Sequence, residues 1–177
     1  GCRDFFVASL DEGVDLRKLL SDCPISVFFG PQPGEAEEFL RHRLKPILND
    51  LGQIELWRTH ASRGAPGKAV LQIDTGMSRL GLPPEEVARL EAEPERLSGL
   101  DIAFVMSHLA CAEQPEHPMN EAQPAEFKAA LESLGQIVGP AKTSFANSSG
   151  IFLGPEFHFD LARPGAALYG INPTPDK

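Results

Sequence analysis

The sequence predicts an α/β fold whose parallel sheet forms part of a (β/α)8 TIM barrel. Short apolar runs alternate with polar helical stretches along all 177 residues. The apolar runs lack the strict alternation of half-buried strands, which is typical of strands buried on both faces of a parallel sheet. About seven strand–helix units follow one another at a mean spacing of roughly 25 residues, the usual length of a β/α unit.

Seven stretches define the predicted strands. They are Phe5–Ala8, Ile25–Phe29, Pro46–Leu48, Ala69–Ile73, Ile102–Met106, Thr143–Ala146, and a closing strand or bent pair over Phe157–Leu161 and Ala166–Tyr169. Helices are predicted over Leu10–Leu20, Glu35–Leu44, Gln53–Ser62, Pro84–Ala92 and Glu121–Leu134, with a short apolar turn at Ile151–Leu153. The helix that begins at Pro84 has a clear start, because a proline followed by two glutamates suits a first turn.

Two architectures compete for this pattern, an open doubly wound sheet and a barrel. A complete barrel usually needs about 250 residues and eight units. Seven units without a lead-in strand therefore predict strands two to eight of a barrel, and an incomplete barrel domain over residues 1–177. Such an open barrel would expose two unpaired sheet edges, which invites association.

Composition and charge exclude several classes of protein. The chain has 16 Lys+Arg and 25 Asp+Glu, for a net charge of −9. This balance argues against nucleic-acid binding but allows one small phosphorylated ligand. No run approaches the roughly 18 consecutive apolar residues of a membrane span, and the first residues do not form a secretory signal. Cys2, Cys23 and Cys111 fit neither a disulfide framework nor a zinc pattern, and indicate reduced thiols in a cytosol.

Polar motifs follow four consecutive predicted strands, at the edge of a parallel α/β sheet that usually carries the chemistry. They are Asp74–Gly81 (DTGMSRLG), Ser107–Ala110 (SHLA), Asn147–Gly150 (NSSG) and Ala162–Ala166 (ARPGA). Random loops would carry more Asp, Glu and Lys than these four segments do. The pattern indicates a binding site at the carboxyl ends of the strands.

Each motif has a structural and a functional interpretation. Arg79 is either a surface arginine or a fixed guanidinium that faces an anionic oxygen. His108 is either a hydrogen-bonded core histidine or a site residue. Asn147 and Ser148 suit a turn, but small side chains, hydroxyls and free backbone N–H groups also suit a phosphate. Arg163 precedes a Pro-Gly pair, where backbone N–H groups can approach a ligand closely.

The other chemically active side chains give weaker signals. Loop, surface or structural roles are expected for the remaining histidines, which are His42, His60, His117 and His158. No feature of a depressed-pKa amine marks the lysines Lys45, Lys68, Lys128 and Lys142. The sequence contains no Ser/His/Asp set, no metal-spaced cluster and no GxxxxGK phosphate loop.

Taken together, the motifs resemble the N-terminal barrel domain of alanine racemase, a fold-type III pyridoxal-phosphate (PLP) enzyme. The matching strings are IDTGMSRLG, MSHLACAE with EHPMNEAQ, FANSSGI and FDLARPGAALYGINP, and FFVASLDEG and ILNDLGQIELW match the early barrel. The resemblance covers essentially the whole chain. It implies interconversion of L- and D-alanine for bacterial peptidoglycan, with PLP as cofactor and a homodimer whose subunits complete each other's sites.

The resemblance implies a phosphate site and a ring site. Ser148, with the backbone of Gly165 and Ala166, would bind the cofactor phosphate, and Asn147 lies beside them. Arg163 would face the pyridine nitrogen. Because an arginine does not give up its proton, the ring would stay unprotonated and act as a weaker electron sink, which favours racemisation over transamination.

Two further residues receive roles from the resemblance. His108 would support Arg163 by hydrogen bonding. Arg79 would face the phenolic oxygen of the cofactor and lie near the substrate carboxylate. In many members a carbamylated lysine braces this arginine, and Gln72 takes its position here. Gln72 could brace Arg79 through neutral hydrogen bonds, or a bound anion could supply the charge.

Two catalytic groups of the family have no counterpart in these 177 residues. The cofactor lysine belongs to a first-strand motif like VKANAYG, and the second base is a tyrosine of a C-terminal β-domain. Tyr169, the one tyrosine, lies in the stretch expected to close the barrel. We therefore interpret the sequence as a central piece of an alanine racemase that is inactive alone. The alternatives are a racemase for serine, lysine or a broad substrate set, a non-catalytic barrel scaffold, and, less well supported, a doubly wound nucleotide binder.

Overall fold

The computed structural model describes residues 1–61 and 67–174, and the sheet at its centre has six parallel strands in this part of the chain. The strands are β1 (Phe5–Val7), β2 (Ile25–Val27), β3 (Lys45–Leu48), β4 (Ala69–Gln72), β5 (Ile102–Met106) and β6 (Lys142–Ser144). The α-helices are α1 (Leu10–Leu19), α2 (Ala36–Arg41), α3 (Leu51–Ala61), α4 (Pro84–Ala92), α5 (Met119–Val138) and α6 (Gly150–Leu153). Three 3-10 helices are η1 (Pro94–Leu97), η2 (Pro155–Phe157) and η3 (Ala166–Tyr169).

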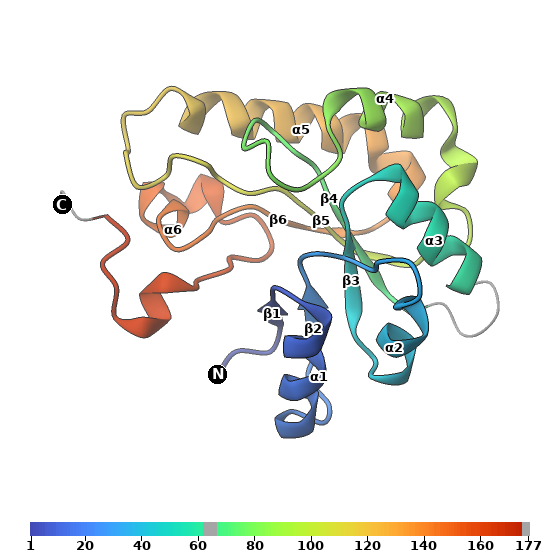
Figure 1. The fold of residues 1–177 in the computed structure, drawn as a ribbon. Helices are drawn as coiled ribbons and strands as arrows, with labels where there is room; N and C mark the ends of the chain where they lie inside the picture. The colour runs from blue at the N-terminus through green and yellow to red at the C-terminus, as the bar shows by residue number, and fades with distance from the viewer. Residues whose placement is uncertain (62–66, 175–177) are drawn as a thin grey trace.

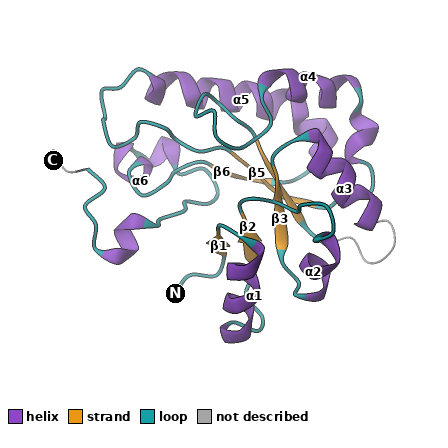
Figure 2. Cartoon of the chain, viewed as in Figure 1, coloured by secondary structure: helices purple, strands orange, loops and turns teal. Residues whose placement is uncertain are grey.

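The sheet curls into a half-barrel. Its strands lie side by side in chain order from β1 to β6, and each is parallel to the one before it. A doubly wound sheet would reverse its strand order part-way, so the observed order excludes that architecture. Figure 1 shows the strands at the centre with α1 to α5 around them, and Figure 2 shows the long loops that connect the last elements. The predicted α/β class with a parallel barrel-type sheet is therefore confirmed, and the sheet described here is a half-barrel.

The predicted seventh strand is not confirmed, because residues 157–169 contain only isolated bridge positions, at Phe159 and Leu161. Leu161 pairs with Ser144 of β6. Phe159 has a φ of 51°, which an extended strand does not allow. The carboxylate of Asp160 then accepts hydrogen bonds from the backbone and side chain of Thr143, at 2.8 and 2.7 Å. The expected strand over Ala166–Tyr169 is the 3-10 helix η3.

Most other boundaries agree with the sequence to within a few residues. The helix α4 and the strand β5 have the predicted limits. The helix α5 is longer than predicted at both ends, and it stops at Gly139, whose φ of 68° suits a helix end. Ser62, the predicted end of the third helix, lies outside the described residues.

Two apolar clusters give the sheet its two faces. The larger cluster joins outward-facing strand residues such as Val27 and Leu71 to helix residues such as Trp57 and Phe127, all fully buried. The smaller cluster lies on the inner face of the curled sheet and contains Ile47, Val70, Phe104 and Met106. Strand residues alternate between these two clusters, because successive side chains of a strand point to opposite faces.

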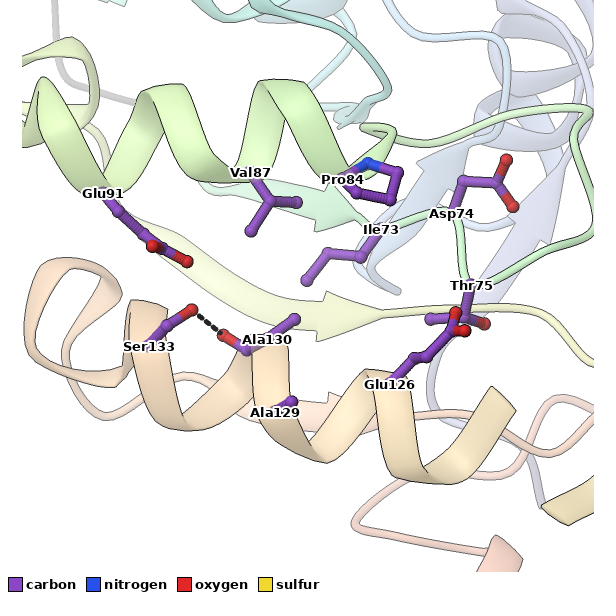
Figure 3. A pocket seen from close by; sticks show the side chains of 10 residues that line it. All are labelled: Ile73, Asp74, Thr75, Pro84, Val87, Glu91, Glu126, Ala129, Ala130 and Ser133. Atoms are coloured by element: carbon purple, nitrogen blue, oxygen red, sulfur yellow. Dashed lines mark hydrogen bonds between the residues drawn. The ribbon is translucent and has the colours of Figure 1, made fainter. Parts of the chain in front are cut away.

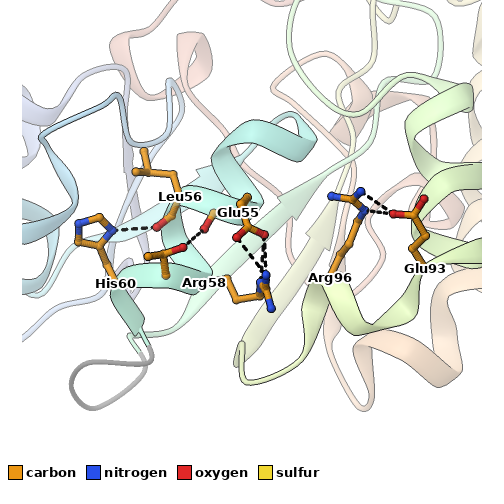
Figure 4. A network of polar contacts seen from close by, with 7 residues as sticks. Glu55, Leu56, Arg58, His60, Glu93 and Arg96 are labelled. Carbon is orange, nitrogen blue, oxygen red and sulfur yellow. Dashed lines mark hydrogen bonds and ion pairs between the residues drawn. The ribbon is translucent and has the colours of Figure 1, made fainter.

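Surface ion pairs lie on the helices outside this core. Figure 4 shows Glu55 with Arg58 on α3, and Arg96 of η1 with Glu93. Both are partly exposed pairs three residues apart, so each contributes little to stability. No helix in the described part of the chain is long and apolar enough to cross a membrane.

Arg17 ties the end of α1 to the loops that lead into β2 and β3. Its guanidinium donates hydrogen bonds of 2.8 to 3.2 Å to five backbone carbonyls, those of Leu20, Ser21, Cys23, His42 and Arg43. Burial and the nearby Arg43 lower the pKa of Arg17. A single side chain therefore satisfies the carbonyls of two loops that are far apart in sequence.

We expect Arg17→Met to lower the free energy of unfolding by about 2 kcal/mol, because the five carbonyls lose a charged donor while the apolar stem stays. Urea unfolding monitored by circular dichroism measures this loss. The matched control is Arg41→Met, since Arg41 pairs with Glu38 on the surface of α2, and it should change stability by less than about 0.5 kcal/mol. Equal losses in the two variants would contradict the assignment.

Candidate functional site

Three of the four polar motifs meet at the carboxyl ends of β5 and β6. Arg163 lies at the centre of these motifs. Its backbone N–H donates to the Ala146 carbonyl at 2.8 Å, which holds the residue beside the strand ends. Its guanidinium reaches Ser107 after β5 and Ser144 at the end of β6. The arrangement follows from the parallel sheet, which brings the carboxyl ends of neighbouring strands to one edge.

Arg163 is a buried cation without a carboxylate partner in the described structure. Nη1 donates to Ser144 Oγ, and Nη2 donates to the Ser107 carbonyl at 2.6 Å and the Phe145 carbonyl at 3.4 Å. Nε–H is buried and has no hydrogen-bond partner among the described residues. Burial lowers the pKa of Arg163 to about 9, which still leaves the group protonated at neutral pH. Carbonyl and hydroxyl dipoles therefore stabilise this charge.

His108 lies beside Arg163. Its Nδ1 is 3.4 Å from Arg163 Nη2, and its Nε2 is 3.5 Å from Asn147 Nδ2. Burial, Arg163 and Arg79 lower the pKa of His108 to about 4. The imidazole is neutral at physiological pH, so Nδ1 can accept from the guanidinium. The sequence predicted this contact between His108 and Arg163.

Ser148 is next to a cluster of backbone N–H groups. Its Oγ accepts hydrogen bonds from Gly165 N at 2.8 Å and from Ala167 N at 3.2 Å. Gly165 and Ala166, which the resemblance assigns to the phosphate, lie beside this hydroxyl, and Ala167 supplies its second N–H. Asn147 holds this turn, because its Oδ1 accepts from Gly150 N at 2.9 Å and its Nδ2 donates to the Leu109 carbonyl at 3.2 Å. The Ser148 hydroxyl and the start of η3 thus form a small polar surface.

The loop that carries Arg79 is held at both of its ends. Asp74 accepts hydrogen bonds from the backbone N–H groups that follow it, those of Gly76, Met77 and Ser78, at 2.9 to 3.1 Å. At the other end, Gly81 has a φ of 112°, and a Cβ there would come within 2.7 Å of Asp74 N. The loop returns to the sheet at Leu82, whose N–H donates to the Gln72 carbonyl at 2.8 Å.

Arg79 itself is exposed and makes no hydrogen bond or ion pair within residues 1–61 and 67–174. It is close enough to His108 to lower the pKa of that imidazole. Gln72 Nε2 donates to the Leu80 carbonyl at 3.1 Å, so it holds the loop backbone next to Arg79 rather than the guanidinium. Gln72 Oε1 is buried without a partner. The structure therefore leaves a fixed loop with a free cation at its tip.

Sequence reasoning missed the residues that support Arg163 and His108. Ser107, Ser144 and Thr75 are buried hydroxyl groups, and Gln123 is a buried amide on α5. Ser107 directly follows the apolar run of β5, and Ser144 is the last residue of β6, so each serine looks like a strand terminus. Their partners lie on other elements, so only the tertiary structure identifies them.

Lysine and histidine residues outside the motifs have structural contacts. Lys45 is more distinctive than its sequence suggested, because burial lowers its pKa and its Nζ lies 3.3 Å from Asp4 Oδ1 and 4.9 Å from the centre of the Phe104 ring. His158 Nε2 is 3.0 Å from the Ile151 carbonyl. His60 Nδ1 lies at 2.9 Å from the Leu56 carbonyl on α3 (Figure 4). None of these contacts reaches Arg163.

A groove of about 310 Å³ lies between α4 and α5 (Figure 3). Its lining is Ile73, Asp74, Thr75, Pro84, Val87, Glu91, Glu126, Ala129, Ala130 and Ser133. Arg163, His108 and Ser148 are not part of this lining. The groove approaches the polar cluster only at Thr75, whose hydroxyl bonds to Ser107 on the other side.

Comparison with known proteins identifies the family of this chain. Residues 1–173 match the model of the family described as "Alanine racemase, N-terminal domain". The chain belongs to the alanine racemase N-terminal domain family. An alanine racemase of Rhodospirillum rubrum is 49% identical over 176 residues, and a catabolic alanine racemase of Mesorhizobium japonicum is 50% identical over 181 residues.

Solved structures of the alanine racemase family have the same fold. The alanine racemase of Bartonella henselae, solved with covalently bound pyridoxal phosphate, is 39% identical, with a TM-score of 0.91 over 98% of this chain. The enzyme of a D-cycloserine-producing Streptomyces lavendulae is 28% identical with the same TM-score. This chain spans only about half the length of its relatives, 46% of both curated proteins and 50% of the Bartonella chain.

The depressed pKa of His108 predicts a specific pH dependence of stability. The unfolded chain binds a proton near the usual histidine pKa of 6.5, whereas the folded chain does so near 4. The unfolded state therefore holds more protons in this window, and stability falls as pH decreases from about 6.5 to about 4, by up to about 3 kcal/mol. Urea unfolding at several pH values measures the loss. In His108→Gln this part of the slope should disappear, and an unchanged slope would contradict the neutral buried imidazole.

Proposed function

We propose that this chain forms the cofactor-binding barrel of a PLP-dependent alanine racemase, which interconverts L-alanine and D-alanine. The observation that supports the proposal most directly is the buried pair of Arg163 and His108 beside the Ser148 turn. Arg163 bonds to carbonyls and hydroxyls instead of a carboxylate. The relatives named alanine racemase, and the Bartonella structure with bound pyridoxal phosphate, support the reaction and the cofactor.

The residues present fit PLP. Two backbone N–H groups, at Gly165 and Ala167, meet at the Ser148 hydroxyl, and such a set of donors suits a phosphate. The buried Nε–H of Arg163 has no partner among the described residues, so it is a donor available to the pyridine nitrogen. We therefore assign the phosphate to Ser148, Gly165, Ala166 and Ala167, next to Asn147, and the ring nitrogen to Arg163.

When bound, PLP withdraws electrons from the α-carbon of the amino acid and makes its proton more acidic. Arg163 stays protonated at neutral pH and cannot transfer its proton to the ring nitrogen easily, so it moderates this withdrawal. His108, which is neutral, accepts from the guanidinium at Nδ1 and keeps it in place. Arg79 offers a free cation near His108 and would bind the phenolic oxygen of the cofactor and the carboxylate of the substrate.

Further features of the parent enzyme belong to the same proposal. The lysine and tyrosine bases that the family uses would come from segments outside these 177 residues, and a homodimer would complete each site. The three cysteines are free thiols, which suits a cytoplasmic protein that supplies D-alanine for bacterial peptidoglycan.

The intact polypeptide that carries this chain should convert L-alanine to D-alanine when PLP is present. A coupled assay with D-amino-acid oxidase measures the product. Arg163→Met should lower kcat by at least about tenfold, because the ring nitrogen loses its donor and His108 loses its partner. Arg41→Met, a surface variant, is the control for handling and expression. No D-alanine above the level of free PLP in the wild-type protein would rule out the racemase assignment.

Ser148→Ala should weaken PLP binding by about tenfold, which corresponds to the loss of about 1.4 kcal/mol from one hydroxyl contact. Fluorescence titration of the intact polypeptide with PLP measures the dissociation constant. Ser149→Ala is a matched control, because the Ser149 hydroxyl donates to the Pro173 carbonyl at 2.8 Å and makes no contact with Gly165. The phosphate assignment would be wrong if the two variants bound PLP equally well.

A further inference from the structure

Gln123 is a fully buried amide that connects α5 to the ends of two strands. Its Oε1 accepts a hydrogen bond from Ala110 N at 2.9 Å. Its Nε2 donates to Thr75 Oγ1 at 3.1 Å and to the His108 carbonyl at 3.0 Å. One side chain from α5 thus contacts the loop after β4 and the loop after β5.

The three contacts require an amide. The Ala110 N–H needs an acceptor, whereas the His108 carbonyl needs a donor, and glutamine supplies both from one planar group. An ionised glutamate in this place would only accept and would face the His108 carbonyl with a negative charge. A buried polar group is costly unless it is bonded, so an amide with all these bonds is well suited to hold the loop in one conformation.

Two short paths connect Gln123 to Arg163. Along the backbone, Gln123 holds the carbonyl of His108, and the preceding carbonyl, that of Ser107, accepts from Arg163 Nη2 at 2.6 Å. Through side chains, Gln123 bonds to Thr75, whose Oγ1 lies 2.8 Å from Ser107 Oγ. The orientation of the segment from Ser107 to Ala110 therefore depends on Gln123 on one side and on Arg163 on the other.

We propose that Gln123 is a positioning residue that fixes the His108 imidazole against the Arg163 guanidinium. It acts through the backbone of residues 108–110 and through Thr75, and it does not touch the cofactor site itself. Its effect on catalysis rests on the proposed racemase function, whereas its effect on His108 depends only on the contacts described here.

The test compares two buried amides on the same face of α5. Asn120, three residues before Gln123, is buried and donates to the carbonyls of Cys111, Gln114 and Pro115, but it does not contact His108 or Thr75. The variants Gln123→Met and Asn120→Leu each remove an amide and keep the approximate volume. Both should lower stability, so stability alone does not separate a positioning role from a structural one.

The ionisation of His108 separates the two roles. NMR titration of histidine labelled with 13C at Cε1, in the intact polypeptide, follows this group, and the spectrum of His108→Gln assigns its signal. In Gln123→Met the loop relaxes and the imidazole moves away from Arg163 toward solvent. We therefore expect the pKa of His108 to rise from about 4 by one unit or more, whereas Asn120→Leu leaves it unchanged.

Kinetics of the holoenzyme supply a second readout. Gln123→Met should lower kcat about tenfold or more, the usual range for residues that support a site, and Asn120→Leu should change it less than twofold. If Gln123→Met does not fold, Thr75→Val removes one of its partners and should raise the pKa of His108 in the same direction, while Thr75→Ser keeps the hydroxyl and restores the wild-type value.

A pKa of His108 that stays near 4 in folded Gln123→Met would overturn the proposal. Where Gln123→Met does not fold, the same result in Thr75→Val would overturn it. Equal shifts of the His108 pKa in Gln123→Met and Asn120→Leu would also overturn it. Failure of the racemase function is a separate outcome. If the wild-type polypeptide makes no D-alanine, the kinetic readout is lost, but the titration of His108 still decides whether Gln123 positions it.

Discussion

The burial of one guanidinium without a carboxylate constrains the rest of the site. A cation removed from water is costly unless hydrogen bonds replace its hydration. Arg163 is 8% exposed, and the groups that bond to it are the Ser107 and Phe145 carbonyls, the Ser144 hydroxyl and the His108 ring. These groups lie at or just after the carboxyl ends of β5 and β6. Groups at both strand ends therefore replace the hydration of this charge.

The curled sheet makes this solvation possible. Neighbouring parallel strands end side by side, so loops separated by more than 50 residues in sequence, such as those of His108 and Arg163, reach one point. The outward face of the same strands packs against Trp57 and Phe127, and this apolar layer keeps the strands in register. Helix α5 then does more than cover the sheet, because its buried amide Gln123 holds the loop that carries His108.

The sequence predicted the elements whose signals are local. Helix α4 begins with Pro84 and two glutamates, and strand β5 is an uninterrupted apolar run, so both were predicted with their correct limits. The predicted seventh strand is interrupted at Phe159, which has a left-handed backbone conformation. The carboxylate of the next residue, Asp160, accepts a hydrogen bond from Thr143 of β6. Nothing in the run of residues around Phe159 reveals that partner.

The candidate site divides in the same way. The adjacency of His108 and Arg163 could be predicted, because each follows a strand of the same parallel sheet and the motifs resemble one family. The supporting groups Ser107, Ser144 and Gln123 could not be predicted, because their partners lie 13 or more residues away in the sequence. Gln123 bonds to Ala110, and Ser144 bonds to Arg163. The bond between Ser148 and Ala167 has a similar origin, because it depends on how the 3-10 helix η3 begins at Gly165.

The charges at the strand ends also explain how an acidic protein can offer an anion site. The chain has a net charge of −9, yet burial and two guanidinium groups, those of Arg163 and Arg79, lower the pKa of His108 and keep it neutral. The carboxylate of Asp74, on the same loop as Arg79, is directed to the backbone N–H groups of Gly76, Met77 and Ser78. Local placement of charge, and not the net charge of the chain, therefore decides which ligand this edge of the sheet attracts.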